Sequence, residues 1–173
     1  MTASSDRERA LEQDVFDEWP PQLRAIFDGT SLETKTGFTA SLVTLDANGH
    51  LRTSLLGVGE LYAPDSRTMC IALWPQSRAA RTLARGGRAA LTFVFNDTFY
   101  QVQLDLQPLR GDGGGLACFT GSIDTGEAQR VRYAHLTGGI RFELEDEQVG
   151  EVLDRWKQQI EHLKKVAGAA SGH

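Results

Sequence analysis

The pattern of apolar and polar positions changes along the chain from helical to strand-like. Between Asp6 and Glu18 the apolar side chains recur at helical spacing, and a second short helical segment follows a Pro-Pro pair. Beyond residue 37 the apolar residues occur instead in short, β-branched runs, which is typical of strands. We therefore predict N-terminal helices over residues 6–29 and a barrel over residues 37–145, after a disordered segment at residues 1–5.

Turn residues separate the strand-like runs. Asn48-Gly49 suits a turn that needs positive φ angles, and Pro64-Asp65-Ser66 marks the next turn. Phe99 to Leu109 alternates between apolar and polar side chains, which predicts a strand with one face in water. The predicted strands cover residues 38–45, 50–61, 67–73, 88–95, 99–109, 116–124 and 140–144.

The last element has the clearest helical pattern. Its apolar residues keep a three-to-four spacing from Val149 to Val166, acidic residues precede it, and Gly168 follows. We predict a helix over residues 147–167 whose apolar stripe covers one side of the barrel; the alternative is a helix that binds a partner. These elements together predict one domain over residues 6–168.

Composition excludes several classes of function. The 173 residues carry a formal net charge of −5 and show no basic face interleaved with aromatic residues, so we expect no binding to nucleic acid. The polar start and the absence of a long apolar run predict a cytoplasmic protein without membrane association. Cys70 and Cys118 lack metal-ligand spacing, as do the four histidines, so we expect buried reduced thiols and no metal site.

One segment is strongly basic against this acidic background. Ser77 opens a short helix that carries Arg78, Arg81 and Arg85, and no acidic residue follows before Arg88. The start of a helix exposes unpaired N–H groups that attract phosphate, and a Ser hydroxyl and an Arg fork add further donors. The segment is either an anion site for a phosphorylated cofactor or a solvated helix whose arginines pair with acids elsewhere.

No side chain stands out as a catalytic acid, base or nucleophile. The glycine-rich stretch over residues 111–115 lacks the Lys and Ser/Thr of a phosphate-binding loop, and no Gly-x-Ser-x-Gly sequence occurs. If the protein is an enzyme, a bound cofactor must therefore supply the chemistry.

The order of these elements resembles the split-barrel flavin-binding family related to pyridoxamine 5′-phosphate oxidase. The resemblance covers about residues 37–109: the Asn48-Gly49 turn, a strand over residues 51–56, a strand leading to Trp74, the Ser77-Arg78 pair, the basic helix and two further strands. It implies a mainly β fold with flanking helices, built as an antiparallel split β-barrel. It also implies a homodimer that binds FMN at the subunit interface. The tail over residues 133–142 is similar to uncharacterised bacterial members.

The resemblance implies a role for individual residues. Arg52, Ser77 and Arg78 match positions that hold the flavin phosphate; Ala79 replaces a family lysine, for which Arg81 would substitute. Gln101 matches a glutamine that reaches the cofactor from the neighbouring subunit. The isoalloxazine ring would lie along Thr53, Ser54, Leu55 and Leu56, and the next strand would approach it through Ala72 and Leu73. Trp74 is either a packing residue or a ring contact.

Two departures from the family pattern concern the substrate. Gly57 stands where the oxidase has a lysine that grips the substrate phosphate, and the oxidase's C-terminal substrate motif is missing. We therefore expect no action on pyridoxamine 5′-phosphate, unless Arg132 or Arg141 supplies the missing charge. Three hypotheses remain: an FMN-dependent oxidoreductase, a deazaflavin-dependent reductase, and a non-catalytic protein that holds flavin or haem. The sequence names neither the substrate nor the electron donor.

Overall fold

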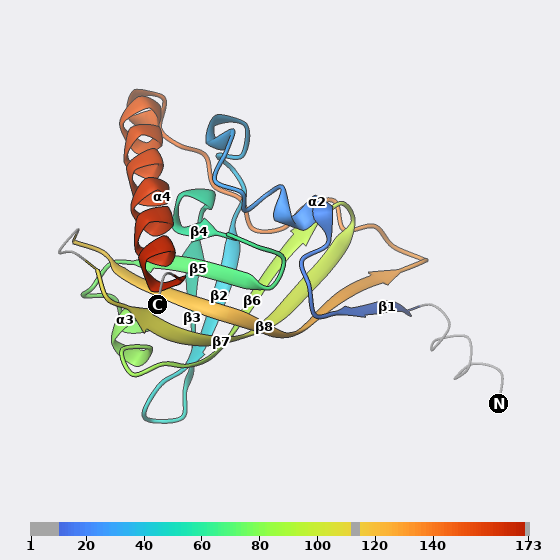
Figure 1. Ribbon diagram of the computed structural model, residues 1–173. Coiled ribbons are helices and arrows are strands. Elements are labelled where there is room, and N and C mark those ends of the chain that lie inside the picture. The colour runs from blue at the N-terminus through green and yellow to red at the C-terminus, as the bar shows by residue number, and fades with distance from the viewer. Residues whose placement is uncertain (1–10, 112–114, 172–173) are drawn as a thin grey trace.

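A computed structural model describes residues 11–111 and 115–171 and shows a strongly curved antiparallel sheet (Figure 1). Its strands follow the order β3-β2-β6-β7-β8-β5-β4, and β1 pairs with β8 outside this path. The strands are β1 (Leu11–Phe16), β2 (Ala40–Leu45), β3 (Leu51–Leu56), β4 (Leu61–Tyr62), β5 (Thr68–Leu73), β6 (Gly87–Phe95), β7 (Thr98–Leu109) and β8 (Ala117–Val131). The helices are α2 (Pro21–Arg24), α3 (Arg78–Thr82) and α4 (Val149–Ser171), with 3₁₀ turns η1 (Leu32–Thr34), η2 (Val58–Glu60) and η3 (Asp146–Gln148).

The long strand β8 pairs with β7 along one edge and with two different strands, β5 and β1, along the other. It pairs with β7 on one side along most of its length. On its other side it pairs first with β5, through residues 117–122, and then with β1, through residues 126–131. Because β5 and β1 occupy different stretches of the same edge, the sheet opens between them, and the fold is a half-barrel rather than a closed cylinder.

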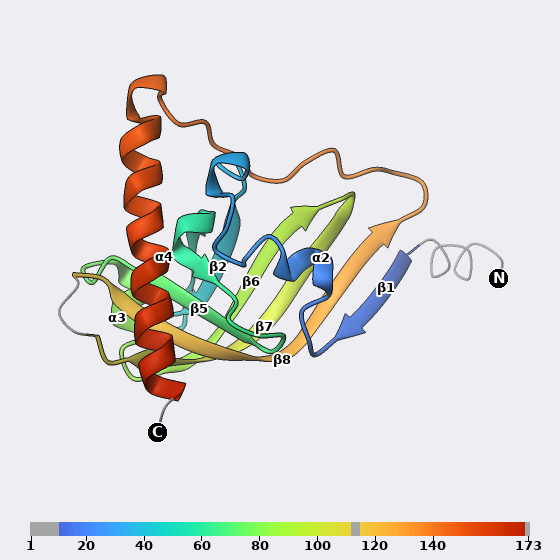
Figure 2. The same cartoon turned by 45° about the horizontal axis from the view of Figure 1, so that its top comes forward.

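The alternation of side chains separates a buried inner face of the sheet from an outer face. On β7 the side chains of Val102, Leu104 and Leu106 are buried, while Gln101 is half-buried and Asp105 exposed. Figure 2 shows α2 and α4 on the same side of the sheet. Burying each large apolar side chain contributes about 1.5–3 kcal/mol. The predicted apolar stripe of α4 covers the barrel: Trp156, Ile160, Leu163 and Val166 are buried.

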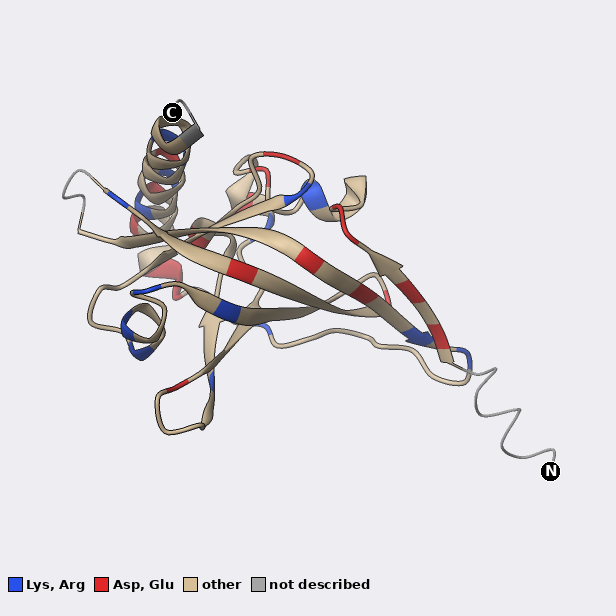
Figure 3. Cartoon of the chain, turned by 60° about the horizontal axis from the view of Figure 1, so that its bottom comes forward, with Lys and Arg blue, Asp and Glu red and all other residues tan. Residues whose placement is uncertain are grey.

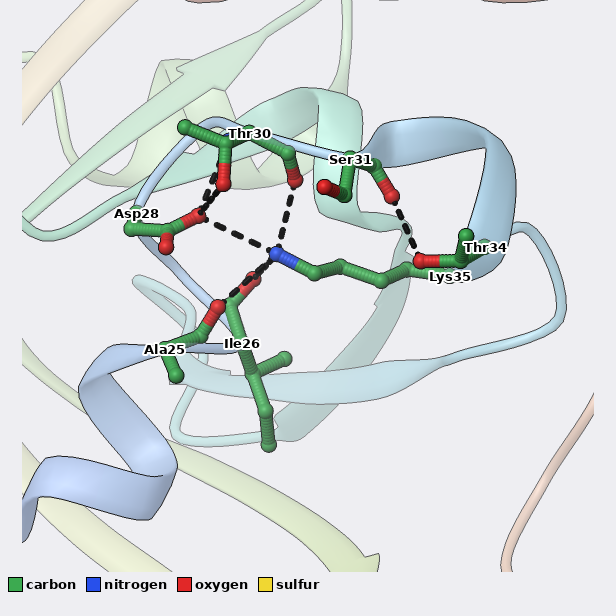
Figure 4. A network of polar contacts seen from close by, with 7 residues as sticks. All are labelled: Ala25, Ile26, Asp28, Thr30, Ser31, Thr34 and Lys35. Carbon is green, nitrogen blue, oxygen red and sulfur yellow. Dashed lines mark hydrogen bonds and ion pairs between the residues drawn. The ribbon is translucent and has the colours of Figure 1, made fainter.

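Lys35 fixes the loop between α2 and β2 (Figure 4). Its ammonium group donates hydrogen bonds to the carbonyl oxygens of Ala25 at 2.8 Å, Ile26 at 3.2 Å and Thr30 at 2.8 Å, and it lies 3.1 Å from Asp28 Oδ1. These contacts tie the end of α2 to the following loop, so that Leu23 and Phe27 stay in the core.

Two predicted elements are wrong: the first part of the N-terminal helix and the strand over residues 140–144. Residues 11–16 form strand β1 instead of a helix, because the edge of β8 beyond β5 offers backbone groups that a paired strand can satisfy. Residues 140–144 form no strand; this stretch meets the sheet only at a bridge between Phe38 and Arg141. The predicted disorder of residues 1–5, and residues 6–10 of the predicted helix, lie outside the described residues.

Helix α4 is longer than predicted. It begins at Val149 and continues through Gly168 to Ser171, because Ala169 and Ala170 are strong helix formers. The predicted loop over residues 111–115 is described only at its two ends. Cys70 and Cys118 are buried thiols, as predicted. Among the described residues, no helix has the length and apolar character needed to cross a membrane.

Candidate functional site

The curvature of the sheet brings its two edges together around a cavity. Strand β3 forms one edge, strands β5 and β4 form the other, and η2 connects the two edges directly along the chain. A cavity of about 240 Å³ lies between them, under α4. It is lined by Ser54, Leu55, Leu56, Glu60, Ala72, Leu73, Trp74, Ser77, Leu116 and Gln159.

Most of the cofactor-binding positions expected from the resemblance meet in this cavity. Residues 54–56 come from β3, residues 72–74 come from the end of β5, and Ser77 precedes α3. Leucine side chains and the indole of Trp74, which is 57% exposed, make its walls mainly apolar. The structure does not bring Arg52, Thr53, Arg78, Arg81 or Gln101 into the lining of the cavity.

Arg52 lies at the start of β3 and bonds to the adjoining turn. Its Nε donates to Asp46 Oδ2 at 3.0 Å. The pKa of Asp46 is lowered, first by the backbone N–H of His50 and then by Arg52. The bond to Asp46 uses only Nε, so the terminal nitrogens of Arg52 can still donate to a phosphate.

The basic helix α3 is short and capped by its own serine. Ser77 Oγ accepts a hydrogen bond from the Ala80 N–H at 3.1 Å, and its hydroxyl proton remains available to a ligand. Arg78 and Arg81 are exposed and form no ion pair with any residue that the structure describes, whereas Arg88 lies 3.7 Å from Asp124. Figure 3 shows the basic positions of α3 beside strands whose charges are mostly acidic.

Gln101 lies on the outer face, away from the cavity of its own chain. The sheet register places Leu55, Ser41, Thr92 and Gln101 in one row across β3, β2, β6 and β7. Three strand spacings separate Leu55 from Gln101, or about 14 Å. Thr53 lies on the same outer face. Gln101 therefore lies outside the lining of its own chain's cavity.

The structure adds Glu60, Leu116 and Gln159 to the predicted set. Gln159 is only 8% exposed, and its Oε1 has no hydrogen-bond partner among the described residues. Its sequence position carries a signal that could have revealed it, because it is a polar residue on the buried stripe of α4 between Trp156 and Leu163. Glu60 carries no comparable signal, since it follows a Gly-Val-Gly stretch that resembles an ordinary turn.

The environment of Glu60 is unusual for a carboxyl group. Its Oε2 accepts a hydrogen bond from the Gly57 N–H at 2.6 Å. Burial raises the pKa of Glu60, and neither this hydrogen bond nor the charge of Arg155 cancels the effect of burial. The cavity is thus lined by Ser77, which precedes the basic helix, and by two acceptors, the half-buried Glu60 and the buried Gln159.

Comparison with known proteins supports this fold. No family model matches the chain. The uncharacterised protein YclD of Bacillus subtilis is 29% identical over 147 residues, which cover 83% of this chain and 94% of YclD. A candidate pyridoxamine 5′-phosphate oxidase from Lactobacillus delbrueckii superposes with a TM-score of 0.51 at 13% identity, over 64% of this chain and 94% of that one.

A second solved structure has a similar backbone fold. A HupZ variant from Group A Streptococcus superposes with a TM-score of 0.50 at 11% identity, over 63% of this chain and 98% of that one. At such low identity these likenesses concern the path of the backbone. They confirm the fold that the sequence resemblance implied: this chain folds as a split barrel of the pyridoxamine 5′-phosphate oxidase-like type.

Proposed function

We propose that this protein is an FMN-binding oxidoreductase of the split-barrel type that acts on a substrate other than pyridoxamine 5′-phosphate. The observation that carries the proposal is the shared cavity. Residues 54–56, 72–74 and Ser77 were matched to flavin-binding positions from sequence alone, and the fold gathers all of them around one space. Their meeting does not follow from their sequence spacing, because they come from opposite edges of the sheet.

The residues of the cavity suit a flavin. Leu55, Leu56, Leu73 and Trp74 offer apolar surface to a flat ring. Strand β3 is an edge strand that pairs with β2 alone among the described strands, so alternate backbone groups on its other side are available to a polar ring edge. Arg78 and Arg81, which have no ion-pair partner among the described residues, supply charge for a phosphate.

The chemistry would come from the cofactor, which carries out hydride or electron transfer when it is bound. The chain's own residues bind and orient it. The buried walls at Leu56, Ala72 and Leu73 exclude water from one side, and Trp74 shields the rim. Among the described residues that line the cavity, Glu60 alone has an ionisable side chain, which agrees with a protein that leaves the reactive step to a cofactor.

The size of the cavity supports a homodimer. Sites for small molecules usually enclose about 300–1,000 Å³, and the cavity of a single chain holds about 240 Å³. The edge of the sheet beside it exposes apolar side chains at Leu45, Leu51 and Leu55. We propose that a second copy covers this surface, completes the site and brings its own Gln101 to the cofactor.

Trp156 limits the room at Gly57, the position that the resemblance matches to a family lysine. A Cβ built on Gly57 would lie 3.1 Å from Trp156 Cζ2, so little room exists there for a longer side chain. The acceptor that lies beside Gly57 is the Glu60 carboxyl, which does not favour a substrate phosphate. Arg132 pairs with Glu12 at 2.9 Å, and neither Arg132 nor Arg141 lines the cavity. We therefore propose that pyridoxamine 5′-phosphate is not the substrate.

The absorbance spectrum and the mass of the molecule that co-purifies test this function. FMN would give a flavin spectrum that bleaches on anaerobic addition of NADH or NADPH. A deazaflavin would differ in mass, and haem would give a Soret band. Turnover of pyridoxamine 5′-phosphate at a kcat/KM of about 10⁴ M⁻¹s⁻¹ or above would contradict the proposed specificity.

A further inference from the structure

Gln159 holds a carbonyl oxygen in a buried position where the described residues provide no hydrogen-bond donor. The side chain is 8% exposed, Oε1 lacks a partner, and the residue lines the cavity between β3 and β5. An unpaired buried acceptor is costly, so native structures seldom keep one without a reason. A ligand in the cavity that carries an N–H group would provide the missing donor.

Glu60 supplies a second acceptor to the same cavity. One of its carboxyl oxygens accepts the Gly57 N–H at 2.6 Å, and the side chain lines the cavity together with Gln159. Two acceptors without a basic residue among the lining side chains disfavour an anionic group and favour a neutral group that donates hydrogen bonds. These two acceptors therefore differ in chemistry from the arginines of α3, which lie outside the lining of the cavity.

The two acceptors are held in place by the packing of α4 on η2. Trp156 lies one helical turn before Gln159, and Glu60 follows Gly59, whose backbone packs against the Trp156 ring. The residues that carry the acceptors therefore belong to two segments in direct contact, the turn η2 and the C-terminal helix α4. Such a fixed pair can select a ligand by its donors.

We propose that Gln159, assisted by Glu60, recognises the imide N–H on the pyrimidine edge of the flavin ring. This inference rests on the proposed flavin site. The imide is the only N–H that an oxidised isoalloxazine carries, and it is a neutral donor. A deazaflavin carries the same imide, so the recognition applies to either cofactor. Haem offers no N–H at its edge, and its propionates are anions that these acceptors would disfavour.

The test compares FMN with 3-methyl-FMN, which lacks the imide N–H, in equilibrium binding to the purified apoprotein. The wild-type protein should bind FMN at least about tenfold more tightly, the factor expected of one net hydrogen bond. In Gln159→Leu, FMN affinity should fall about tenfold, and the preference over 3-methyl-FMN should shrink to less than about threefold. Gln158→Leu, one position along on the exposed side of α4, should leave both affinities unchanged.

The melting temperature of the apoprotein gives an independent readout. Gln159→Leu should raise it, because the substitution removes a buried acceptor that lacks a partner. A purely structural glutamine would lower it when replaced. Equal binding of FMN and 3-methyl-FMN to the wild type would overturn this inference and leave the proposed flavin site standing. Persistent discrimination in Gln159→Leu would also overturn it, by showing that the methyl group is rejected for its size. Failure of the wild type to bind FMN at all would reject the proposed function itself.

Discussion

The Trp156 ring packs so closely on Gly59 that a Cβ atom at residue 59 would collide with the indole. This contact joins the C-terminal helix α4 to the turn η2 between β3 and β4. Glu60 follows Gly59 in that turn, and Gln159 lies one turn beyond Trp156 on the helix. Close packing at one glycine therefore sets the positions of both acceptors in the candidate site.

Replacing Gly59 should loosen α4 from the barrel. Gly59→Ala forces the indole or the helix to move, and overpacking of this kind costs about 1–3 kcal/mol. We expect a lower melting temperature and weaker FMN binding. Gly168→Ala is the matched control: nothing lies within 4 Å of a Cβ at that position of α4, so the better helix propensity of alanine should stabilise the protein by up to about 1 kcal/mol. Equal stability of Gly59→Ala and the wild type would show that the contact does not hold the helix.

A substitution at Arg78 tests the proposed contact with the flavin phosphate. It is exposed and has no ion-pair partner among the described residues, so Arg78→Ala should leave the fold unchanged. A charge-assisted contact with phosphate contributes about 1.5–3 kcal/mol, and its loss should weaken FMN binding by about one to two orders of magnitude. Arg85→Ala, in the same basic segment, should have little effect. Titration that finds unchanged affinity in Arg78→Ala would remove this residue from the site.

Lys35 should matter for stability rather than for binding. Its ammonium group contacts Ala25, Ile26, Asp28 and Thr30 (Figure 4), and its side chain is only 18% exposed. Lys35→Met keeps the aliphatic stem but leaves the carbonyl oxygens of Ala25 and Thr30 without this donor. We expect a loss of about 1.5–3 kcal/mol in the free energy of unfolding, measured by chemical denaturation. FMN affinity should stay the same, since the loop is not part of the cavity.

The same network predicts a dependence on pH. Burial acts to raise the pKa of Asp28, but hydrogen bonds from Thr30 and Lys35 outweigh it, and the pKa is lowered overall. Because the folded pKa lies below the unfolded value of about 3.9, the stabilisation is present above that value and is lost as the pH falls through the folded pKa. Asp28→Asn should therefore melt earlier than the wild type at pH 7. If the two melting temperatures differ by the same amount at pH 2, the stabilisation by Asp28 does not come from its charge.

The proposed dimer predicts an effect at the exposed edge of the sheet. Leu51 is 74% exposed on β3, and a twofold interface over this region would bury more than about 1,000 Å² in total. Leu51→Lys should shift the protein from dimer to monomer in light scattering at micromolar concentration. Val15→Lys, at an exposed apolar position on β1, serves as the control. A monomeric wild type with cofactor bound would rule out the dimer.

The sequence was sufficient for the elements whose own residues determine their structure. The alternation over residues 99–109 and the apolar stripe of α4 each mark a buried face, and both predictions are confirmed. The strand at residues 11–16 was missed because its apolar residues Leu11 and Val15 are exposed, so their spacing carries no information about burial. Its conformation depends on the edge of β8, which lies more than a hundred residues away in the sequence.

The residues of the candidate site also fall into those that the sequence indicated and those that depend on distant contacts. Resemblance pointed to the strand residues of the cavity because they follow recognisable turns and the Ser77-Arg78 pair. It did not indicate Glu60 and Gln159, because they line one cavity only when α4 packs on η2; the polar position of Gln159 on the apolar stripe was the one signal in the sequence. Resemblance also matched Arg52 to a phosphate contact, which stays a prediction; its hydrogen bond to Asp46 in the adjoining turn could not be read from that match.

An equilibrium titration of FMN into a variant with a filled cavity tests the central claim most directly. Ala72 is buried and lines the cavity, so the added carbons of Ala72→Leu can occupy the space that the flavin ring would need. We predict that Ala72→Leu folds as the wild type does and binds FMN at least about tenfold more weakly, while Ala47→Leu in the exposed turn before β3 binds it normally. Equal FMN affinity of folded Ala72→Leu and the wild type would show that this cavity is not the flavin site.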